Sequence, residues 1–200
     1  MTQLRAKGQS MPSEINQFGW IILDVPEWAE RMAIQIRQER DKIYGNIYAE
    51  RETDERWVGD LGEIVFKSFL KDRQVSKTQF EWIQEDAAGR ADFIMMDSSS
   101  LDVKTVKRKV PVRADYTAQI TAQHIKEDVE HYFFMSYQNN EKKMTLIGGI
   151  SKAEFKKHAI YYGEGAQVHN NYTIRAGHEI YNIDVTKLTS PDRWLEQFTK

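Results

Sequence analysis

The chain has no cysteine, only 4 prolines, and no apolar run long enough to cross a bilayer. The absence of cysteine excludes disulfides, thiol nucleophiles and cysteine-ligated zinc. The first residues carry no pattern typical of a signal peptide. Together, these absences predict a soluble, cytoplasmic protein with no membrane partner.

No sign of charge dominates, because 28 Lys and Arg residues face 30 Asp and Glu residues, for a net charge of -2. Such a balance gives no global attraction to nucleic acid, so any binding of that kind requires a local basic patch. The 200 residues, 40% of them hydrophobic, suffice to bury one sizeable core. We predict a core domain over residues 51–200, preceded by an N-terminal extension over residues 1–50 with one long helix.

The long helix of the extension is predicted over residues 27–49. Asp24 can act as its N-cap, and Pro26 stands near its first position. The apolar side chains that recur on one face are Trp28, Met32, Ile36 and Ile43. The side chains predicted to form the solvated face are Arg37, Glu39, Arg40 and Asp41.

A second helix is predicted over residues 54–72, with a broad apolar face that should pack against a sheet. It contains Gly59 and Gly62, and Glu63 follows directly. A glycine inside a helix costs about 1 kcal/mol relative to alanine, so two of them call for a reason. The simplest reason is close approach of this helix to another element, with Glu63 nearby.

A β-hairpin is predicted over residues 93–106, because a short apolar run, a turn rich in Asp and Ser, and an alternating segment follow one another. Asp102 and Lys104 are two residues apart in the second strand and therefore share one face of the sheet. Asp92 opens the partner strand and can lie opposite them. Other strands are predicted at 80–83, 117–121, 132–137 and 144–150, and short helices at 152–158 and from Pro191 to Phe198, each after a capping serine.

The order of these elements resembles the PD-(D/E)XK nuclease superfamily, whose fold is the restriction-endonuclease-like fold. The likeness covers residues 54–106: the helix with Glu63, the strand at 80–83, Asp92, and then Asp102-Val103-Lys104. Ala91 stands where the family name has proline. The resemblance implies an α/β fold with a mixed central sheet flanked by helices. It also implies cleavage of DNA phosphodiester bonds that depends on Mg²⁺, for which Mn²⁺ can substitute, without an organic cofactor.

On this resemblance, Asp92 and Asp102 would ligate the metal, and the carbonyl of Val103 would add a third oxygen. Lys104 would position the attacking water or stabilise charge on the phosphate. Glu63 would hold a second metal or orient water. Four basic residues would grip the nucleic-acid backbone without reading sequence: Lys107, Arg108, Lys109 and Arg113.

Each assignment has an alternative. Asp102 and Lys104 could be an exposed ion pair that adds little stability, and the basic cluster could be a charged loop. Polar residues near the site, Gln119, Gln123 and His124, are expected to be satisfied or to face solvent. The chain as a whole could be a non-catalytic nucleic-acid-binding module of the same fold, or a metal-stabilised structural protein. Restriction-type cleavage of both strands would favour a homodimer.

Overall fold

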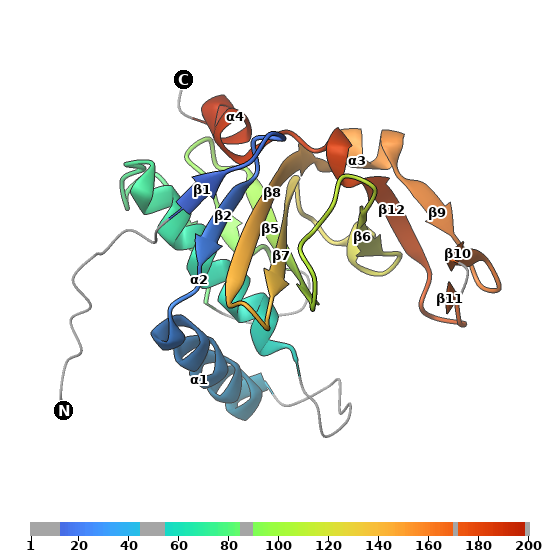
Figure 1. Ribbon diagram of the computed structural model, residues 1–200, viewed down its shortest axis with the longest axis horizontal. Coiled ribbons are helices and arrows are strands. Elements are labelled where there is room, and N and C mark those ends of the chain that lie inside the picture. Colours follow the sequence, from blue (N-terminus) through green and yellow to red (C-terminus); the bar gives the residue numbers. More distant parts are fainter. Residues whose placement is uncertain (1–12, 45–54, 85–89, 170–171, 199–200) are drawn as a thin grey trace.

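A seven-stranded mixed sheet runs through the centre of the molecule (Figure 1). The computed structural model describes residues 13–44, 55–84, 90–169 and 172–198. The strands of the sheet, in spatial order, are β1 (Ser13–Ile15), β2 (Ile21–Asp24), β8 (Lys143–Ser151), β7 (His131–Gln138), β5 (Ser100–Arg108), β4 (Phe93–Ile94) and β3 (Glu81–Trp82). Only β5 and β7 run parallel to each other, so the predicted mixed sheet is confirmed.

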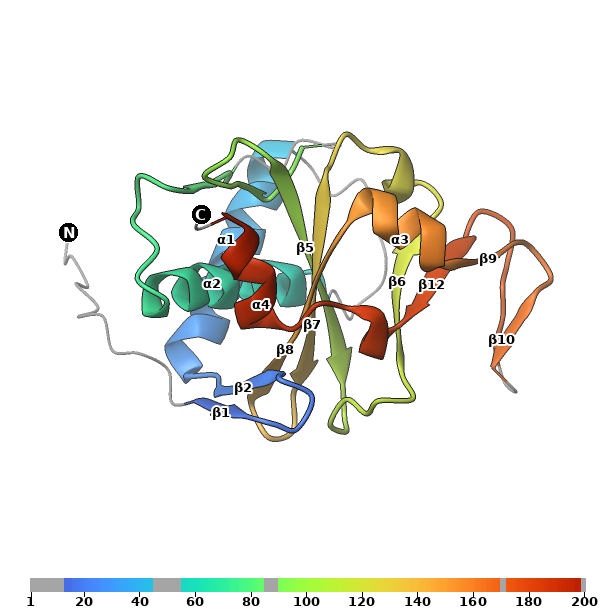
Figure 2. The same cartoon turned by 90° about the horizontal axis from the view of Figure 1, so that it is seen from above.

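Helices and a second sheet cover the two faces of the central sheet (Figure 2). One face carries α1 (Glu27–Tyr44), α2 (Trp57–Asp72) and α4 (Pro191–Leu195). The other face carries α3 (Lys152–His158) and a three-stranded sheet of β6 (Thr117–Thr121), β12 (Ile180–Asp184) and β9 (Ile160–Tyr162). The remaining elements are the hairpin of β10 (Gln167–His169) and β11 (Tyr172–Thr173), and the 3₁₀ turns η1 (His124–Lys126), η2 (Val185–Lys187) and η3 (Glu196–Phe198). The α/β class with flanking helices is therefore confirmed.

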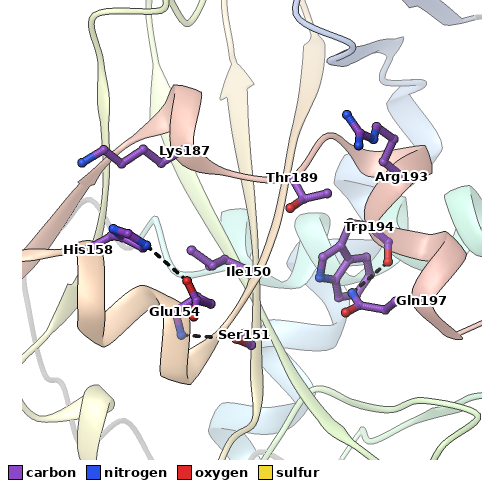
Figure 3. Close-up of a pocket in the computed structure, with 9 residues that line it drawn as sticks. All are labelled: Ile150, Ser151, Glu154, His158, Lys187, Thr189, Arg193, Trp194 and Gln197. Atoms are coloured by element: carbon purple, nitrogen blue, oxygen red, sulfur yellow. Dashed lines mark hydrogen bonds and ion pairs between the residues drawn. The ribbon is translucent and has the colours of Figure 1, made fainter.

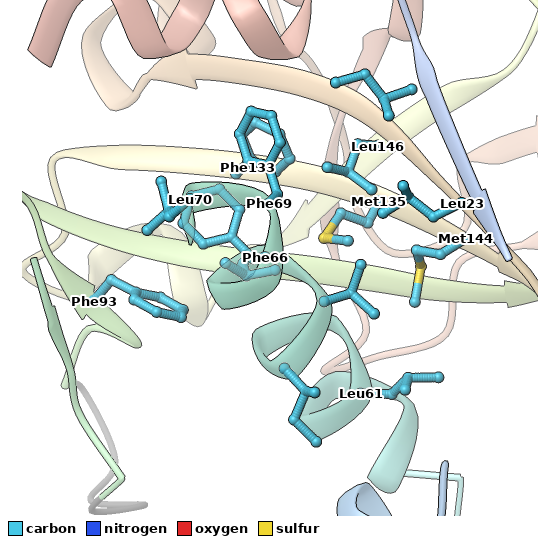
Figure 4. Close-up of a cluster of buried hydrophobic side chains, with 14 of the residues drawn as sticks. Leu23, Leu61, Phe66, Phe69, Leu70, Phe93, Phe133, Met135, Met144 and Leu146 are labelled. Carbon is cyan, nitrogen blue, oxygen red and sulfur yellow. The ribbon is translucent and has the colours of Figure 1, made fainter. Parts of the chain in front are cut away.

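The larger core lies between α2 and the central sheet (Figure 4). The ring of Phe66 on α2 lies 4.8 Å from that of Phe133 on β7 and 5.0 Å from that of Phe93 on β4. Leu61 and Leu70 of the same helix are fully buried. Each such side chain contributes roughly 1.5–3 kcal/mol on burial, so the predicted apolar face of this helix anchors it to the sheet.

The two glycines of α2 have different surroundings. A Cβ on Gly62 would lie 1.9 Å from Oγ1 and 3.0 Å from Cβ of Thr105, so α2 and β5 approach closely at this point. The predicted close approach is thus confirmed for Gly62. A Cβ on Gly59 would meet nothing within 4 Å, because this residue faces a pocket.

The predicted burial pattern of α1 is wrong at most positions, although Ile36 packs against the core and Glu39 is exposed as predicted. Trp28, Met32 and Ile43 are 42%, 43% and 71% exposed, whereas Arg40, predicted to be solvated, is 6% exposed. The residues of α1 that face the core include the fully buried Ala29. Small side chains allow α1 to pack closely on α2, and charged partners on α2 draw Arg40 inward.

The other predicted elements match the structure with two differences. The hairpin forms with Phe93 opposite Leu101, and Ser151 caps α3 by accepting a hydrogen bond from Glu154 N at 3.2 Å. The segment between β6 and β7 contains the 3₁₀ turn η1 in addition to the predicted elements. Ser190 precedes α4 but makes no side-chain cap hydrogen bond there. The predicted helix ends at residues 45–49 and 54, and the turn at 86–89, lie outside the described residues.

The N-terminal strand and helix are joined to the rest of the described chain. β2 pairs with β8 from Ile21 to Asp24, and α1 lies against α2. The predicted division near residue 50 stays a prediction, since it falls in the undescribed residues 45–54. Within the described ranges, none of the helices combines the length and the apolar character needed to span a membrane.

We expect Gly62→Ala to lower the free energy of unfolding by about 1–3 kcal/mol, because the added methyl group overpacks the contact with Thr105. Gly59→Ala should leave it unchanged or raise it by up to about 1 kcal/mol, since alanine favours the helix and the space is open. Urea denaturation of both variants measures this difference. Equal effects of the two substitutions would contradict the close approach of α2 to β5 at Gly62. In a Thr105→Ala background, Gly62→Ala should lower the free energy of unfolding by less than it does in the wild type.

Candidate active site

The candidate site lies at an edge of β5 that β4 leaves uncovered. The register pairs β4 only with Ser100 and Leu101, although β5 continues to Arg108. Beyond that point the backbone N–H of Val103 donates to Asp92 Oδ2 at 2.7 Å, so a side chain takes the place of the missing strand. Since the N–H and C=O of one residue point to the same edge of a strand, the carbonyl of Val103 faces this edge too.

Asp102 and Lys104 form an ion pair on one face of β5. Lys104 Nζ lies 2.8 Å from Asp102 Oδ2. The side chain of Asp102 is 3% exposed and that of Lys104 is 28% exposed, so the lysine covers the carboxylate. The alternative that Asp102 and Lys104 form an exposed ion pair is therefore wrong, because the carboxylate is buried. Tyr132 and Phe134 of β7 stand beside the two residues in register.

The pKa values of the site reflect its crowding by carboxylates. Burial, followed by the negative charges of Glu63 and Asp102, raises the pKa of Asp92 well above its usual value, against the charge of Lys104. Burial alone would lower the pKa of Lys104, but the charges of Asp102 and Asp92 outweigh it and raise the pKa. Lys104 is thus held in its charged form, while Asp92 binds a proton more readily than an ordinary aspartate.

Glu63 lies at the same pocket, and both of its carboxylate oxygens already accept hydrogen bonds. Its Oε1 accepts from Arg40 at 2.8 Å, and its Oε2 accepts from Arg40 at 3.0 Å and from Trp82 Nε1 at 2.7 Å. Burial raises the pKa of Glu63, against the hydrogen bonds and charge of Arg40. Metal binding by Glu63 stays a prediction, and it would require these contacts to rearrange.

Arg37, Arg40 and Asp60 are charged residues beside the site that the sequence interpretation missed. Asp60 is fully buried and accepts from Arg37 Nε at 2.7 Å and from Arg40. A buried carboxylate is stable only when it is paired and hydrogen-bonded. The sequence spacing could have indicated this network. Two acids, Asp60 and Glu63, are three residues apart in one predicted helix, and two arginines are three residues apart in the helix before it.

A pocket of about 540 Å³ joins these groups. Glu63, Asp92, Val103 and Lys104 line it, and Asp102 lies buried beneath Lys104. The pocket continues along β5 and reaches β6. Its walls therefore carry both carboxylates and cations, with room for a ligand of the usual size for protein pockets.

Of the polar residues predicted near the site, Gln119 and His124 have different surroundings. Gln119 on β6 lines the pocket. His124 Nδ1 lies 2.9 Å from Thr121 Oγ1, as expected for a satisfied side chain. Burial, and then the charge of Lys104, lowers the pKa of His124, which places the imidazole near the lysine without a direct contact.

The four basic residues predicted to bind nucleic acid have different surroundings, and their role stays a prediction. Lys107 Nζ pairs with Glu55 at 2.7 Å, and Arg113 pairs with Asp115 at 2.7 Å. Arg108 lines the pocket, and Lys109 is exposed. Only Arg108 therefore connects this cluster to the candidate site.

A second pocket of about 480 Å³ lies between α3, η2 and α4 (Figure 3). Glu154 and His158 on its wall pair with each other at 3.2 Å, and their side chains are 53% and 41% exposed. Exposed pairs of this kind contribute at most about 1 kcal/mol. None of the residues predicted for the active site lines this pocket, so we assign it no catalytic role.

The donor set at the edge of β5 suits a hard cation. Across the described ranges, no group of three His, Cys, Asp or Glu side chains is arranged to hold a metal ion. The donors are instead two carboxylates, Asp92 and Asp102, and the main-chain oxygen of Val103. Mg²⁺ prefers oxygen ligands of this type and keeps several waters, so it needs no third side chain. Asp92 also forms no ion pair within the described structure, which leaves a negative charge for a cation to balance.

A comparison with protein-family models and with curated proteins finds no match for this chain. The likeness to PD-(D/E)XK nucleases thus rests on the residues and their arrangement alone.

We expect Arg40→Met to lower the free energy of unfolding by about 3–5 kcal/mol, because it leaves the buried carboxylates of Asp60 and Glu63 without their shared partner. Arg31→Met is the matched control, since Arg31 is exposed and pairs only with Glu27 at the surface. It should change stability by less than about 1 kcal/mol. Denaturant titration of both variants is the measurement, and a small effect at Arg40 would mean that the buried network stabilises little.

Proposed function

We propose that the protein is a Mg²⁺-dependent nuclease that hydrolyses phosphodiester bonds in DNA. One observation carries this proposal: Asp92, the Val103 carbonyl and the Asp102–Lys104 pair meet at the uncovered edge of β5. Carboxylates, a carbonyl and an ammonium are the groups that metal-assisted phosphodiester cleavage requires. The open edge allows a phosphate to reach them without displacing a strand.

In this proposal, Asp92, Asp102 and the Val103 carbonyl hold the metal, which would polarise the phosphate and lower the pKa of a bound water. Asp102 can take part only if Lys104 moves away from it, since the ion pair covers its carboxylate. Lys104, held in its charged form, would then turn toward the phosphate and stabilise its negative charge. The lysine thus exchanges one anion for another.

Glu63 keeps its predicted role in holding a second metal or orienting water. Its contacts with Arg40 and Trp82 suggest that it acts mainly through the position of the water. Gly59, which faces the pocket with open space, lets the substrate approach α2 closely. A cytoplasmic location and a homodimer for cleavage of both strands remain part of this proposal.

A non-catalytic binding module is the second candidate. Its supporting observation is that Lys104 pairs with Asp102 and Arg40 pairs with Glu63. A site balanced in this way could bind a polyanion through its cations alone. Substrate cleavage separates the two candidates, whereas a thermal shift with Mg²⁺ does not.

We expect the wild-type protein to cleave DNA with Mg²⁺ or Mn²⁺, and Asp102→Asn and Lys104→Met to slow cleavage by roughly 10²- to 10³-fold each. A gel assay on supercoiled, linear and branched DNA measures this. Glu154→Gln and Lys157→Met are matched controls, since they alter an exposed acid and lysine pair on α3. No cleavage by the wild type, with DNA still bound, would move the assignment to the binding module.

We also expect the Mg²⁺ concentration for half-maximal cleavage to rise as the pH falls. The raised pKa of Asp92 means that protons compete with the metal at higher pH than they would at an ordinary aspartate. Below that pKa, each pH unit weakens metal binding by about tenfold. Cleavage assays across Mg²⁺ concentrations at pH 5 to 8 measure the dependence, and a flat half-maximal concentration would contradict Asp92 as a ligand.

A further inference from the structure

Arg108 differs from the other basic residues near the end of β5. Lys107 and Arg113 each have a carboxylate partner at 2.7 Å, whereas Nε of Arg108 is buried and makes no hydrogen bond. Arg108 also lines the pocket that holds Lys104. Arg108 therefore brings a positive charge to the pocket that no carboxylate of the described residues pairs with, which suits an anionic ligand.

Tyr116 holds Arg108 in this position. The guanidinium carbon of Arg108 lies 4.7 Å from the centre of the Tyr116 ring, within the range of a cation–π contact. Arg113 lies 5.1 Å from the same ring and is anchored by Asp115. The aromatic ring therefore fixes the guanidinium without occupying its hydrogen-bond donors.

Arg108 and Lys104 occupy the same face of β5, because they are four residues apart in a strand. At about 3.3 Å per residue, their backbones are roughly 13 Å apart. The phosphates of one DNA strand follow one another every 3.4 Å or so along the duplex axis. Because the backbone also winds around that axis, neighbouring phosphates of one strand lie roughly 7 Å apart through space, about twice the axial rise. A phosphate bound at Arg108 is therefore about two nucleotides from one bound at Lys104.

We propose that Arg108, braced by Tyr116, binds a phosphate of the substrate strand other than the one that is cleaved. The substrate is accordingly a polynucleotide that extends about two nucleotides or more past the cleaved bond, and not a small phosphodiester. This inference rests on the proposed nuclease function for the position of the cleaved phosphate. Guanidinium groups suit this role because they present several donors to phosphate oxygens and stay charged.

Binding is tested without catalysis, in EDTA, by fluorescence anisotropy with a labelled 20-nucleotide single strand and the corresponding duplex. Arg108→Gln should weaken binding by about tenfold and reduce the slope of log Kd against log salt by about 0.7–0.9, the loss of one phosphate contact. Arg31→Gln, on the exposed surface of α1, is the matched control and should change neither value. An equal loss in Lys109→Gln would overturn the inference, because it would indicate a diffuse charged loop.

Tyr116 is tested as a positioning residue. Tyr116→Phe keeps the ring and should bind as the wild type does, whereas Tyr116→Leu should reproduce most of the loss seen in Arg108→Gln. Circular dichroism of each variant reports whether it is folded. Equal binding by Tyr116→Leu and the wild type would remove the proposed bracing.

Cleavage assays separate this inference from the proposed function. In the wild type and Arg108→Gln, oligonucleotides of decreasing length should show a KM ratio of about ten, with the loss in KM and not in kcat. The ratio should fall toward one once the oligonucleotide is too short to reach from Lys104 to Arg108, about two nucleotides past the cleaved bond. Arg108-dependent binding without any cleavage would keep Arg108 as a phosphate contact of a bound polynucleotide and would refute the nuclease. Cleavage with no dependence of KM on Arg108 at any length would refute the inference and leave the nuclease standing.

Discussion

The contact of Gly62 with Thr105 sets the distance between α2 and β5, and the rest of the site depends on it. Because the helix comes this close, the next residue, Glu63, lies at the pocket that β5 borders. The cost of a glycine inside the helix is offset by the large apolar surface that α2 buries on the sheet, with Phe66 at its centre. The missing Cβ of Gly62 therefore allows the close packing of α2 on β5 and also brings Glu63 to the pocket.

Bringing carboxylates into a packed interface requires cations, and α1 supplies them. Arg40 bonds to both Asp60 and Glu63, and Arg37 adds a second partner for Asp60. Removing charges from water is costly unless each is paired. The helix assigned by sequence to an N-terminal extension is for this reason part of the environment of the site, through its arginines more than through its apolar residues.

Local signals in the sequence predicted the elements that local chemistry determines. The hairpin at Asp92 to Val106, the apolar face of α2 and the Ser151 cap each depend on residues close in sequence. The orientation of α1 was not predictable in the same way, because Trp28 and Met32 suggest a buried face that the structure leaves exposed. What turns Arg40 inward is a pair of acids 20 and 23 residues away, and helical periodicity contains no information on them.

The charge balance of the site could not be predicted for the same reason, because it depends on residues that are distant in sequence. Asp102 and Lys104 are two residues apart in a strand, so the sequence predicted that they share a face. It did not predict that the lysine would cover the carboxylate. In this arrangement Lys104 balances Asp102 and Arg40 balances Glu63, while Asp92 has only the Val103 N–H. Arg108 adds a cation to the same pocket, so the carboxylates and cations there are close to balance. If Asp92 and Asp102 held a divalent ion, as proposed, Lys104 and Arg108 would be the cations left at the pocket for phosphate, whereas a binding module would use the cations alone.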